Sequence, residues 1–245
     1  MIRVVIPVYN EEKNIENCLI GIAQNLNHND CSFYLVNDGS SDNSLKIIEG
    51  LAENLPIKII NHKINKGVSE VFRSAIAETV KDGKPRDVIV IVEGDGTSDP
   101  KLLNLMIKKI EGGQDLVIAS RFQKKGSYKN FPPKRLFYSK LANAVFRVLF
   151  PSSVVKDYTI FYRAYSYNIL RKMVNIYGDD LITSKFFVAN TELLLKIMRE
   201  TQKIEEVGLV YDYGKKRGKS GLNISKNITQ YLIFICRYKI FRRKI

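Results

Sequence analysis

The sequence predicts an α/β fold, with a Rossmann-like, mostly parallel sheet and helices on both of its faces. Over residues 1–120, short apolar runs rich in Val and Ile alternate with segments of helical periodicity, which is the pattern of βαβ units. The chain of 245 residues is long enough for one large domain with a well-buried core. Its content of 45% hydrophobic and 26% charged residues is that of a globular protein.

The elements of this half follow one another in a regular order. We expect strands at 2–8, 32–37, 57–61, 87–93 and 115–120, and helices at 11–26, 41–54, 68–82 and 100–112. In open parallel sheets, ligands bind beyond the carboxyl ends of the strands. The tails of the first four strands are polar, and three of them carry carboxylates: PVYNEE, NDGSSD, NHKINKG and EGDGTSD. This pattern predicts a ligand site at that edge of the sheet.

The fourth strand ends in two carboxylates, Glu93 and Asp95, which alternate with Gly94 and Gly96. Mg²⁺ and Mn²⁺ take hard oxygen ligands and are often held by one or two carboxylates together with substrate phosphates. The glycines permit a tight bend and the close approach of a ligand. Because the turn is one of four polar strand ends at one edge, we predict a metal site rather than a solvated acidic turn.

The second half of the chain is more basic. The loop RFQKKGSYKNFPPKR precedes a helix that we expect near 134–150. Its stripe of Phe and Leu suits packing against the protein and an interfacial membrane helix about equally. The segment ITQYLIFICRYKIFRRKI mixes bulky apolar and basic residues, so we expect 222–245 to form a basic amphipathic tail lying in a membrane interface.

The net charge of +14 predicts an anionic partner: nucleic acid, a membrane surface or a phosphorylated substrate. Nucleic acid binding is disfavoured, because it gives the acidic strand ends no role. No apolar run of 18–20 residues predicts a spanning helix, and no signal-peptide pattern is seen. Cys18, Cys31 and Cys236 fit no metal-ligand spacing, so we expect free thiols and a cytoplasmic location.

Two further patterns in the sequence do not indicate a functional site. GKKRGKS (214–220) has three residues between its glycines, not the four of a phosphate-binding Walker A loop, and follows no clear strand-to-helix turn. His28 and His62 have no metal-ligand neighbours in the sequence, and we interpret both as ordinary surface or loop residues.

The segments VVIPVYNEEKNI, YLVNDGSSDNS and EGDGTSDP, in this order and spacing, resemble the family-2 glycosyltransferases of GT-A fold. The resemblance implies that Asp38 accepts a hydrogen bond from the base of a nucleotide-sugar, and that Glu93 and Asp95 face its ribose, diphosphate and metal (Mg²⁺ or Mn²⁺). Glu93 and Asn37 each stand where the family has Asp. The donor-binding residues that the resemblance implies are Pro7, Tyr9, Asn10, Glu11, Asp38, Glu93, Gly94 and Asp95, with Glu93 and Asp95 as metal ligands.

Downstream, VIASRF, KRLFYSKLAN, KDYTIFYRAY and KKRGKS resemble dolichol-phosphate mannose synthase and bacterial polyprenyl-phosphate glycosyltransferases. Ile160, Phe161 and Tyr162 replace the Ser, Gly and Phe of the family, where the acceptor or sugar pocket is shaped. The acceptor-phosphate residues that the resemblance implies are Arg121, Arg135, Ser139, Arg163 and Lys215. As catalytic residues it implies Asp95, Arg121, Asp157 and Arg163.

The chemistry of sugar transfer distinguishes a hydroxyl acceptor from a phosphate acceptor. A sugar hydroxyl needs a general base, which such enzymes supply from an acidic pair before a helix. Here Ala189 and Asn190 stand at that place, unless the alignment slips and makes Glu192 the base. A phosphate is already ionised and needs cations instead. The sequence therefore favours an inverting transfer from a UDP- or GDP-sugar to a polyprenyl phosphate.

Two alternatives stay open: a carbohydrate hydroxyl acceptor in surface-polysaccharide assembly, and a non-catalytic relic that binds nucleotide or membrane. The preferred interpretation implies a protein peripheral to the inner face of an anionic membrane. A membrane-protein partner or a homo-oligomer is compatible with it. We expect 1–221 to be one domain, with a nucleotide-sugar half (1–120) and an acceptor half (121–221).

Overall fold

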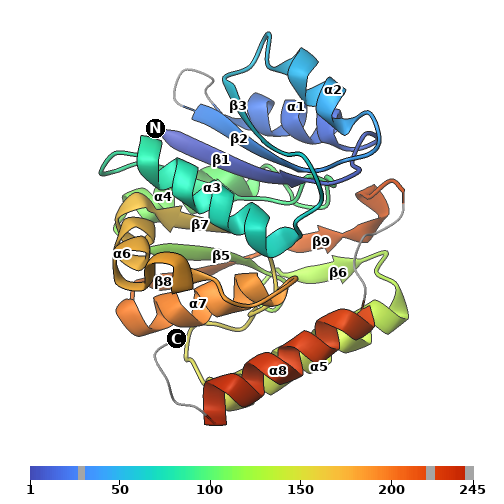
Figure 1. Ribbon diagram of the computed structural model, residues 1–245. Helices are drawn as coiled ribbons and strands as arrows, with labels where there is room; N and C mark the ends of the chain where they lie inside the picture. Colours follow the sequence, from blue (N-terminus) through green and yellow to red (C-terminus); the bar gives the residue numbers. More distant parts are fainter. Residues whose placement is uncertain (27–30, 219–223, 241–245) are drawn as a thin grey trace.

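The computed structural model describes residues 1–26, 31–218 and 224–240. Its main sheet has seven strands in the order β3-β2-β1-β4-β7-β5-β8 (Figure 1). The strands are β1 (Ile2–Val8), β2 (Cys31–Asp38), β3 (Ile57–His62), β4 (Val88–Ile91), β5 (Leu116–Ser120), β7 (Arg163–Ser166) and β8 (Ile204–Gly208). Only β7 is antiparallel to its neighbours. The mostly parallel α/β sheet that the sequence predicted is confirmed.

Helices cover both faces of this sheet. They are α1 (Ile15–Asn25), α2 (Ser44–Leu51), α3 (Val68–Asp82), α4 (Leu102–Glu111), α6 (Tyr167–Tyr177) and α7 (Val188–Glu200), with the 3-10 turn η2 (Gly178–Leu181). Helices α3, α6 and α7 contact one another on the face that is in front in Figure 1. Helix α1 contacts α2 on the other face, where Asn104 of α4 donates to the Asn25 carbonyl at the end of α1.

The first helix and the fourth strand have different bounds from those predicted, because the polar residues after β1 and β4 lie in loops. Helix α1 begins at Ile15 rather than near residue 11, and Asn10, at φ 54°, lies in the left-handed region before it. Strand β4 ends at Ile91, which leaves Glu93 and Asp95 in a turn beyond it. Strands β7 and β8 were not predicted, nor was the small two-stranded sheet of β6 (Ser127–Lys129) and β9 (Val210–Asp212).

The predicted helix near 134–150 is confirmed as α5 (Pro133–Leu149), and α8 (Ile224–Ile240) runs beside it (Figure 1). Tyr231 packs edge-on against Phe146 at 5.4 Å, and Tyr238 packs against Phe150 at 4.7 Å between ring centroids. The inner face of α8 is therefore packed on the protein. The start of the predicted tail (222–223) and its last five residues (241–245) lie outside the described residues.

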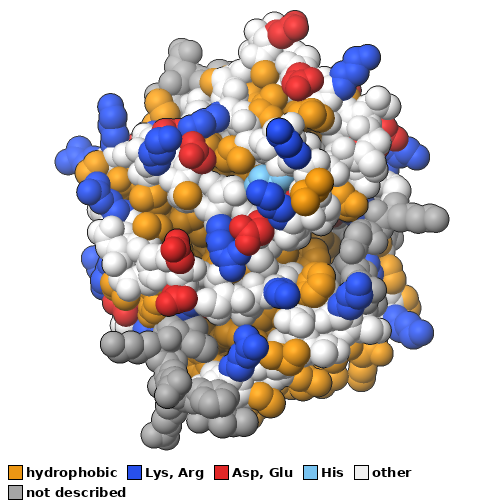
Figure 2. Space-filling model, in the orientation of Figure 1, with side chains coloured by type: hydrophobic (Ala, Val, Ile, Leu, Met, Phe, Trp, Pro, Cys, Tyr) orange, Lys and Arg blue, Asp and Glu red, His pale blue; other side chains and the backbone are white. Residues whose placement is uncertain are grey.

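The outer faces of α5 and α8 remain apolar. Phe137, Val148 and Leu232 are 62%, 80% and 59% exposed. Figure 2 shows hydrophobic side chains along the lower edge of the molecule, over these two helices. Within the described part of the chain, every helix is too short or too polar to span a bilayer.

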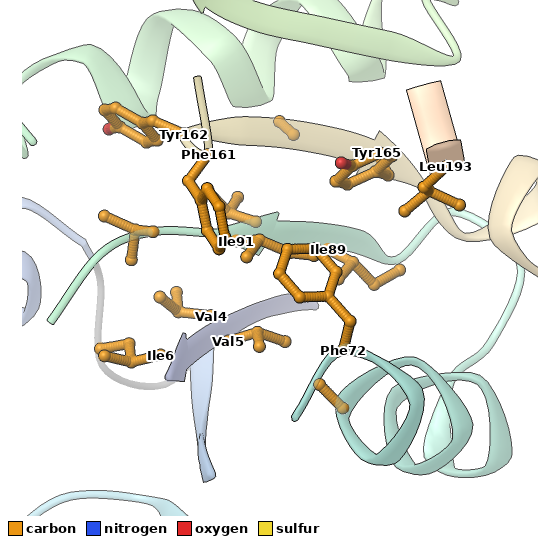
Figure 3. Close-up of a cluster of buried hydrophobic side chains, with 14 of the residues drawn as sticks. Val4, Val5, Ile6, Phe72, Ile89, Ile91, Phe161, Tyr162, Tyr165 and Leu193 are labelled. Atoms are coloured by element: carbon orange, nitrogen blue, oxygen red, sulfur yellow. The ribbon is translucent and has the colours of Figure 1, made fainter. Parts of the chain in front are cut away.

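The core lies between the sheet and its helices (Figure 3). Side chains of β1 and β4, such as Val5 and Ile89, meet Phe72 of α3, and all three are almost fully buried. Phe161 packs edge-on against Phe72, with ring centroids 5.1 Å apart. Burial of apolar surface on this scale is the main favourable contribution to folding. It fixes the strands whose carboxyl ends carry the polar loops.

Candidate active site

A cavity of about 550 Å³ lies beyond the carboxyl ends of β1, β2 and β4. It is lined on one side by loops that follow these strands and on the other by α5, α8 and the segment after β9. The predicted residues that line it are Pro7, Tyr9, Glu11, Asp38, Glu93, Gly94, Asp95, Arg121, Arg135 and Ser139. The donor and acceptor halves of the prediction therefore share one cavity.

The loop after β1 is held by the loop before α2. The Glu11 amide donates to Ser44 Oγ at 2.8 Å, and the Asn10 amide donates to Ser40 Oγ at 3.1 Å. Asn10 does not line the cavity. Its Oδ1 atom accepts from the Ser41 amide at 2.8 Å, so the side chain joins the two loops. Tyr9 is 44% exposed at the cavity mouth.

Asp38 ends β2 and organises the loop before α3. Its Oδ1 accepts from the Lys66 amide at 2.9 Å, and its Oδ2 accepts from the Gly67 amide at 2.8 Å. His62 Nδ1 also lies 2.9 Å from Oδ1, and His62 Nε2 lies 2.9 Å from Ser74 Oγ. His62 is buried, so its interpretation as a surface or loop residue was wrong; His28 lies outside the described residues.

Gly39, which follows Asp38, allows this loop to pass close by. At φ 66° it lies in the left-handed region, and a Cβ atom there would stand 2.5 Å from the Asn65 amide nitrogen. A larger residue would push the loop away. The departure at Asn37 is also explained, because its amide donates to Asn61 Oδ1 of β3 at 2.8 Å, inside the sheet.

The two carboxylates after β4 are held differently. Asp95 Oδ1 accepts from the amide of Thr97 at 3.1 Å and from its hydroxyl at 2.5 Å, which leaves Oδ2 facing the cavity. Glu93 accepts from the Ser98 hydroxyl. Burial, and then the charge of Asp95, raise the pKa of Glu93 to about 7. Gly94 is closely packed, since a Cβ atom there would lie 3.0 Å from the Pro7 carbonyl oxygen.

Lys216, which was not predicted as a site residue, is the cation of this half of the cavity. Its Nζ atom lies 3.0 Å from Asp95 Oδ2 and 3.1 Å from Glu11 Oε1, and the side chain is 7% exposed. Burial opposes its charge, but Asp95 and Glu11 outweigh this and raise its pKa. Lys215, the predicted residue, is exposed and lies outside the cavity lining. The basic run KKRG was the available signal, but it could not show which lysine turns inward.

Glu11, Glu93 and Asp95 offer the oxygen ligands that a divalent cation prefers. The ammonium of Lys216 between two of them shows that this cluster accommodates a positive charge. No set of three Asp, Glu, His or Cys side chains in the described residues is arranged to hold a metal alone. The residues therefore fit an ion that completes its shell with oxygens of a bound diphosphate, as Mg²⁺ commonly does.

The opposite side of the cavity is built around Arg121. Its Nε and Nη2 atoms each donate to Asp157 at 2.7 Å, and Nη2 also donates to Thr159 Oγ1 at 2.8 Å. Burial alone would raise the pKa of Asp157, but the Arg121 guanidinium outweighs it and lowers that pKa. The rings of Tyr128 and Tyr211 lie 5.2 and 5.8 Å from the guanidinium carbon. Arg121 is thus a fixed cation at the cavity wall.

Arg135 and Ser139 of α5 lie on the same side. Arg135 Nη1 donates to the Tyr213 hydroxyl at 2.8 Å, and Ser139 Oγ lies 3.4 Å from the Tyr128 hydroxyl. Both residues line the cavity. The acidic side chains of the described lining, Glu11, Asp38, Glu93 and Asp95, all belong to the donor half. Positive charge therefore faces the anionic cluster across the cavity.

Residues 3–175 match the family model described as Glycosyl transferase family 2. The chain belongs to this family. Dolichol-phosphate mannosyltransferase of Pyrococcus furiosus is 30% identical over 238 residues, which cover 96% of this chain and 63% of that protein. Polyprenol monophosphomannose synthase of Mycolicibacterium smegmatis is 30% identical over 175 residues, which cover 69% and 63%. The chain thus spans less than two thirds of the length of either relative.

Among solved structures, glucosyl-3-phosphoglycerate synthase of Mycobacterium tuberculosis, crystallised with Mn²⁺, UDP and glucosyl-3-phosphoglycerate, matches with a TM-score of 0.69 and 16% identity. The match covers 97% of this chain and 79% of that one. This likeness concerns the fold, and the GT-A fold that the sequence predicted for this family 2 chain is confirmed.

The structure does not bring Arg163 or Asp157 into the cavity lining. Arg163 is fully buried in β7, where it donates to the carbonyls of Asn190 and Tyr158 at 2.7 and 2.9 Å. An acceptor phosphate in the cavity does not reach a guanidinium enclosed in this way, so the predicted role of Arg163 is corrected to a structural one. Asp157, also fully buried, lies behind the cavity wall and accepts two hydrogen bonds from the Arg121 side chain.

The alternative base, Glu192, also lies outside the cavity lining. It is fully buried, accepts from the Thr183 and Ser184 amides at 3.0 and 2.8 Å, and pairs with Lys196 at 2.7 Å. These bonds hold the start of α7 in place. By contrast, Ile160 and Phe161, two of the three departures from the family pattern, do line the cavity, and they make its floor apolar.

Proposed function

We propose that this family 2 chain is an inverting glycosyltransferase that moves a sugar from a nucleotide-sugar to a polyprenyl (dolichyl or undecaprenyl) phosphate. The observation that carries the proposal is the distribution of charge in one cavity. Carboxylates of the strand ends face one side, while Arg135 and Arg121, the latter held from behind by the buried Asp157, face the other. The dolichol- and polyprenol-phosphate relatives support this choice of acceptor.

In the proposed reaction, two anionic groups bind side by side in the cavity: the phosphate of the acceptor and the diphosphate of the donor. A phosphate oxygen of the acceptor attacks the anomeric carbon, and the bond from that carbon to the donor diphosphate breaks with inversion. Arg121 and Arg135 hold the attacking phosphate by charge-assisted hydrogen bonds. A divalent ion, Mg²⁺ or Mn²⁺, at Glu93 and Asp95 supplies positive charge to the leaving diphosphate. A phosphate nucleophile is ionised already, so the geometry requires no base from Glu192.

The free acceptor positions of Asp38 favour uracil as the base. A carboxylate has about four acceptor positions. When His62 Nδ1 donates, it and the Lys66 amide occupy two acceptor positions on Oδ1, and the Gly67 amide occupies one on Oδ2. Uracil presents one N–H between two carbonyls, whereas guanine presents adjacent N1–H and N2–H donors. The single remaining position suits uracil, and we therefore propose a UDP-sugar.

The acceptor also implies a place for the protein. Phe137 and Val148 of α5 are exposed on the helix that carries Arg135 and Ser139. An apolar helix face inserted at the headgroup level would bring the Arg side of the cavity to the phosphate of a polyprenyl lipid. We propose peripheral association with an anionic membrane, on its cytoplasmic face, where nucleotide-sugars are found.

The deciding experiment is a donor and acceptor panel. The protein is incubated with UDP- and GDP-sugars, Mn²⁺ or Mg²⁺, and either a polyprenyl phosphate or a set of free sugars, and products are analysed by mass spectrometry. A glycosylated polyprenyl phosphate from a UDP-sugar is the expected product. Transfer to a sugar hydroxyl alone would favour the polysaccharide alternative, and nucleotide binding without any product would favour the non-catalytic one.

A further inference from the structure

Lys216 holds the two halves of the donor site together. Its ammonium bridges Glu11 after β1 and Asp95 after β4, at 3.1 and 3.0 Å. The neighbouring residue fixes the segment in place, because the Arg217 amide donates to Asn14 Oδ1 at 2.9 Å and the Arg217 carbonyl accepts from Asn14 Nδ2 at 2.8 Å. Lys216 therefore points into the cavity from a docked segment.

The Lys216 ammonium lies where a metal ion bound to Asp95 would lie. Asp95 Oδ1 is engaged by Thr97, so Oδ2 is the atom that remains for a cation, and Lys216 pairs with that atom. Two cations within hydrogen-bond reach of one carboxylate oxygen repel each other strongly in a partly buried site. The ammonium and a divalent ion therefore compete for Asp95.

We infer that Lys216 is a mobile counter-ion of the donor site: it occupies Asp95 and Glu11 in the empty protein, and moves to the diphosphate of the nucleotide when metal and donor bind. A lysine side chain has the flexible stem and the rotatable donors for such a transfer. In the bound state its charge adds to that of the metal at the leaving group. This inference rests on the proposed donor and metal, but not on the proposed acceptor.

The inference predicts effects of opposite sign for one substitution. Lys216→Met removes the competitor from Asp95, so Mn²⁺ alone, titrated calorimetrically into the metal-free protein, binds more tightly, by about tenfold or more. UDP, titrated with Mn²⁺ at saturation, binds more weakly, by about tenfold or more, because its diphosphate has lost a charge-assisted contact. A residue that only supported the local structure would weaken both.

Lys215→Met is the matched control, since it removes the neighbouring exposed charge and should change neither affinity. Lys216→Arg should restore UDP binding, because it keeps the charge near the diphosphate. Thermal unfolding confirms that each variant is folded; if Lys216→Met is not, Lys216→Gln takes its place. Unchanged or weaker binding of Mn²⁺ alone by the folded variant, or unchanged binding of UDP, would overturn the inference.

The outcome is separable from that of the proposed function. If Lys216→Met shows the two opposite shifts but the wild-type protein makes no polyprenyl product, the acceptor proposal fails and the counter-ion inference stands. If it makes the product while Lys216→Met shows no opposite shifts, only the counter-ion inference fails. If the wild-type protein binds neither Mn²⁺ nor UDP, the inference is overturned together with the proposed donor.

Discussion

Arg121 and Asp157 form a two-point ion pair behind the wall of the cavity, with both Nε–Oδ2 and Nη2–Oδ1 at 2.7 Å. Asp157 is fully buried and Arg121 is 8% exposed. Arg121 Nη2 also donates to Thr159 Oγ1, so among described residues the side-chain bonds of Arg121 come from Nε and Nη2. In the proposed site, Nη1 is the nitrogen left for the acceptor phosphate. Asp157 thus fixes the direction in which Arg121 presents its charge.

The first prediction concerns the acceptor phosphate. Arg121→Ala and Arg135→Ala should each raise the KM for polyprenyl phosphate about ten- to a hundredfold, because each removes a charge-assisted contact. The KM for the nucleotide-sugar should change little, since both residues lie on the far side of the cavity from Asp38. Steady-state kinetics with each substrate varied in turn measures the effect.

Arg135→Ala is the cleaner of the two variants. Removing Arg121 leaves Asp157 buried without its partner, and breaking such a pair costs about 3–5 kcal/mol of stability. Lys140→Ala, on the same helix but outside the cavity lining, serves as the control. Wild-type KM values for polyprenyl phosphate in a folded Arg135→Ala variant would count against the acceptor site.

The second prediction concerns the metal. Asp95→Ala should abolish sugar transfer, since a catalytic metal contributes several kcal/mol to stabilisation of the transition state. EDTA should abolish it in the wild-type protein, and Mn²⁺ or Mg²⁺ should restore it there but not in the variant. Asp99→Ala, a carboxylate four residues further on and outside the cavity lining, is the matched control. Full activity in EDTA would contradict the metal site.

Individual residues show which parts of the fold could be predicted from the sequence and which could not. Each of the first strands is a continuous apolar run that ends in a polar motif, and local pattern alone indicates both the strand and the site. Strand β7 was missed because its first residue is Arg163, a charge that no single-strand pattern places in a core. Its two terminal nitrogens, Nη2 and Nη1, donate to the carbonyls of Tyr158 and Asn190, and the second of these residues is 27 positions away.

The missed parts of the site have the same physical origin. His62 became a buried residue because Asp38, 24 residues before it, lies beside it in the neighbouring strand. Lys216 differs from Lys215 only in the direction that the turn η3 (Tyr213–Lys215) gives it. Its two carboxylate partners are 205 and 121 residues away. Such pairings depend on tertiary structure, to which sequence periodicity is blind.

The third prediction concerns pH. Glu93 has a pKa of about 7 in the folded protein against an ordinary value of 4.5, because it is buried beside Asp95. The folded state therefore holds this proton more tightly than the unfolded state. The resulting stabilisation is complete below pH 4.5 and is lost as the pH rises through 7. In the metal-free protein, the free energy of unfolding should thus fall between pH 5 and pH 8.

Glu93→Gln isolates this contribution, since the amide keeps the shape and does not titrate. Urea unfolding at several pH values should show the wild type losing on the order of 2 kcal/mol of stability relative to the variant from pH 5 to pH 8. Saturating Mn²⁺ should reverse the trend in the wild type, because a bound cation favours the ionised carboxylate. Parallel pH profiles of the two metal-free proteins would show that Glu93 titrates normally.

The last prediction concerns the membrane. Deleting the end of the chain would be a poor test, since Phe234 of α8 is 4% exposed and belongs to the core. Substitutions on the outer faces of the two helices avoid this problem. Phe137→Glu, Val148→Glu and Leu232→Glu change side chains that are more than half exposed, so the fold should tolerate them.

Each of these side chains contributes about 1.5–3 kcal/mol when it is fully buried in an apolar medium. Combining two substitutions should therefore abolish flotation with anionic liposomes, while free UDP still binds in solution because the donor loops are untouched. Leu105→Glu is the matched control: Leu105 is 44% exposed on α4, which lies at the sheet and away from α5 and α8, and its replacement should leave flotation unchanged. Wild-type binding should also weaken with salt, since basic residues near the surface add about 1 kcal/mol each at low ionic strength. Undiminished flotation of the double variant would mean that the apolar face of α5 and α8 does not contact lipid, and that the polyprenyl phosphate reaches Arg135 by another route.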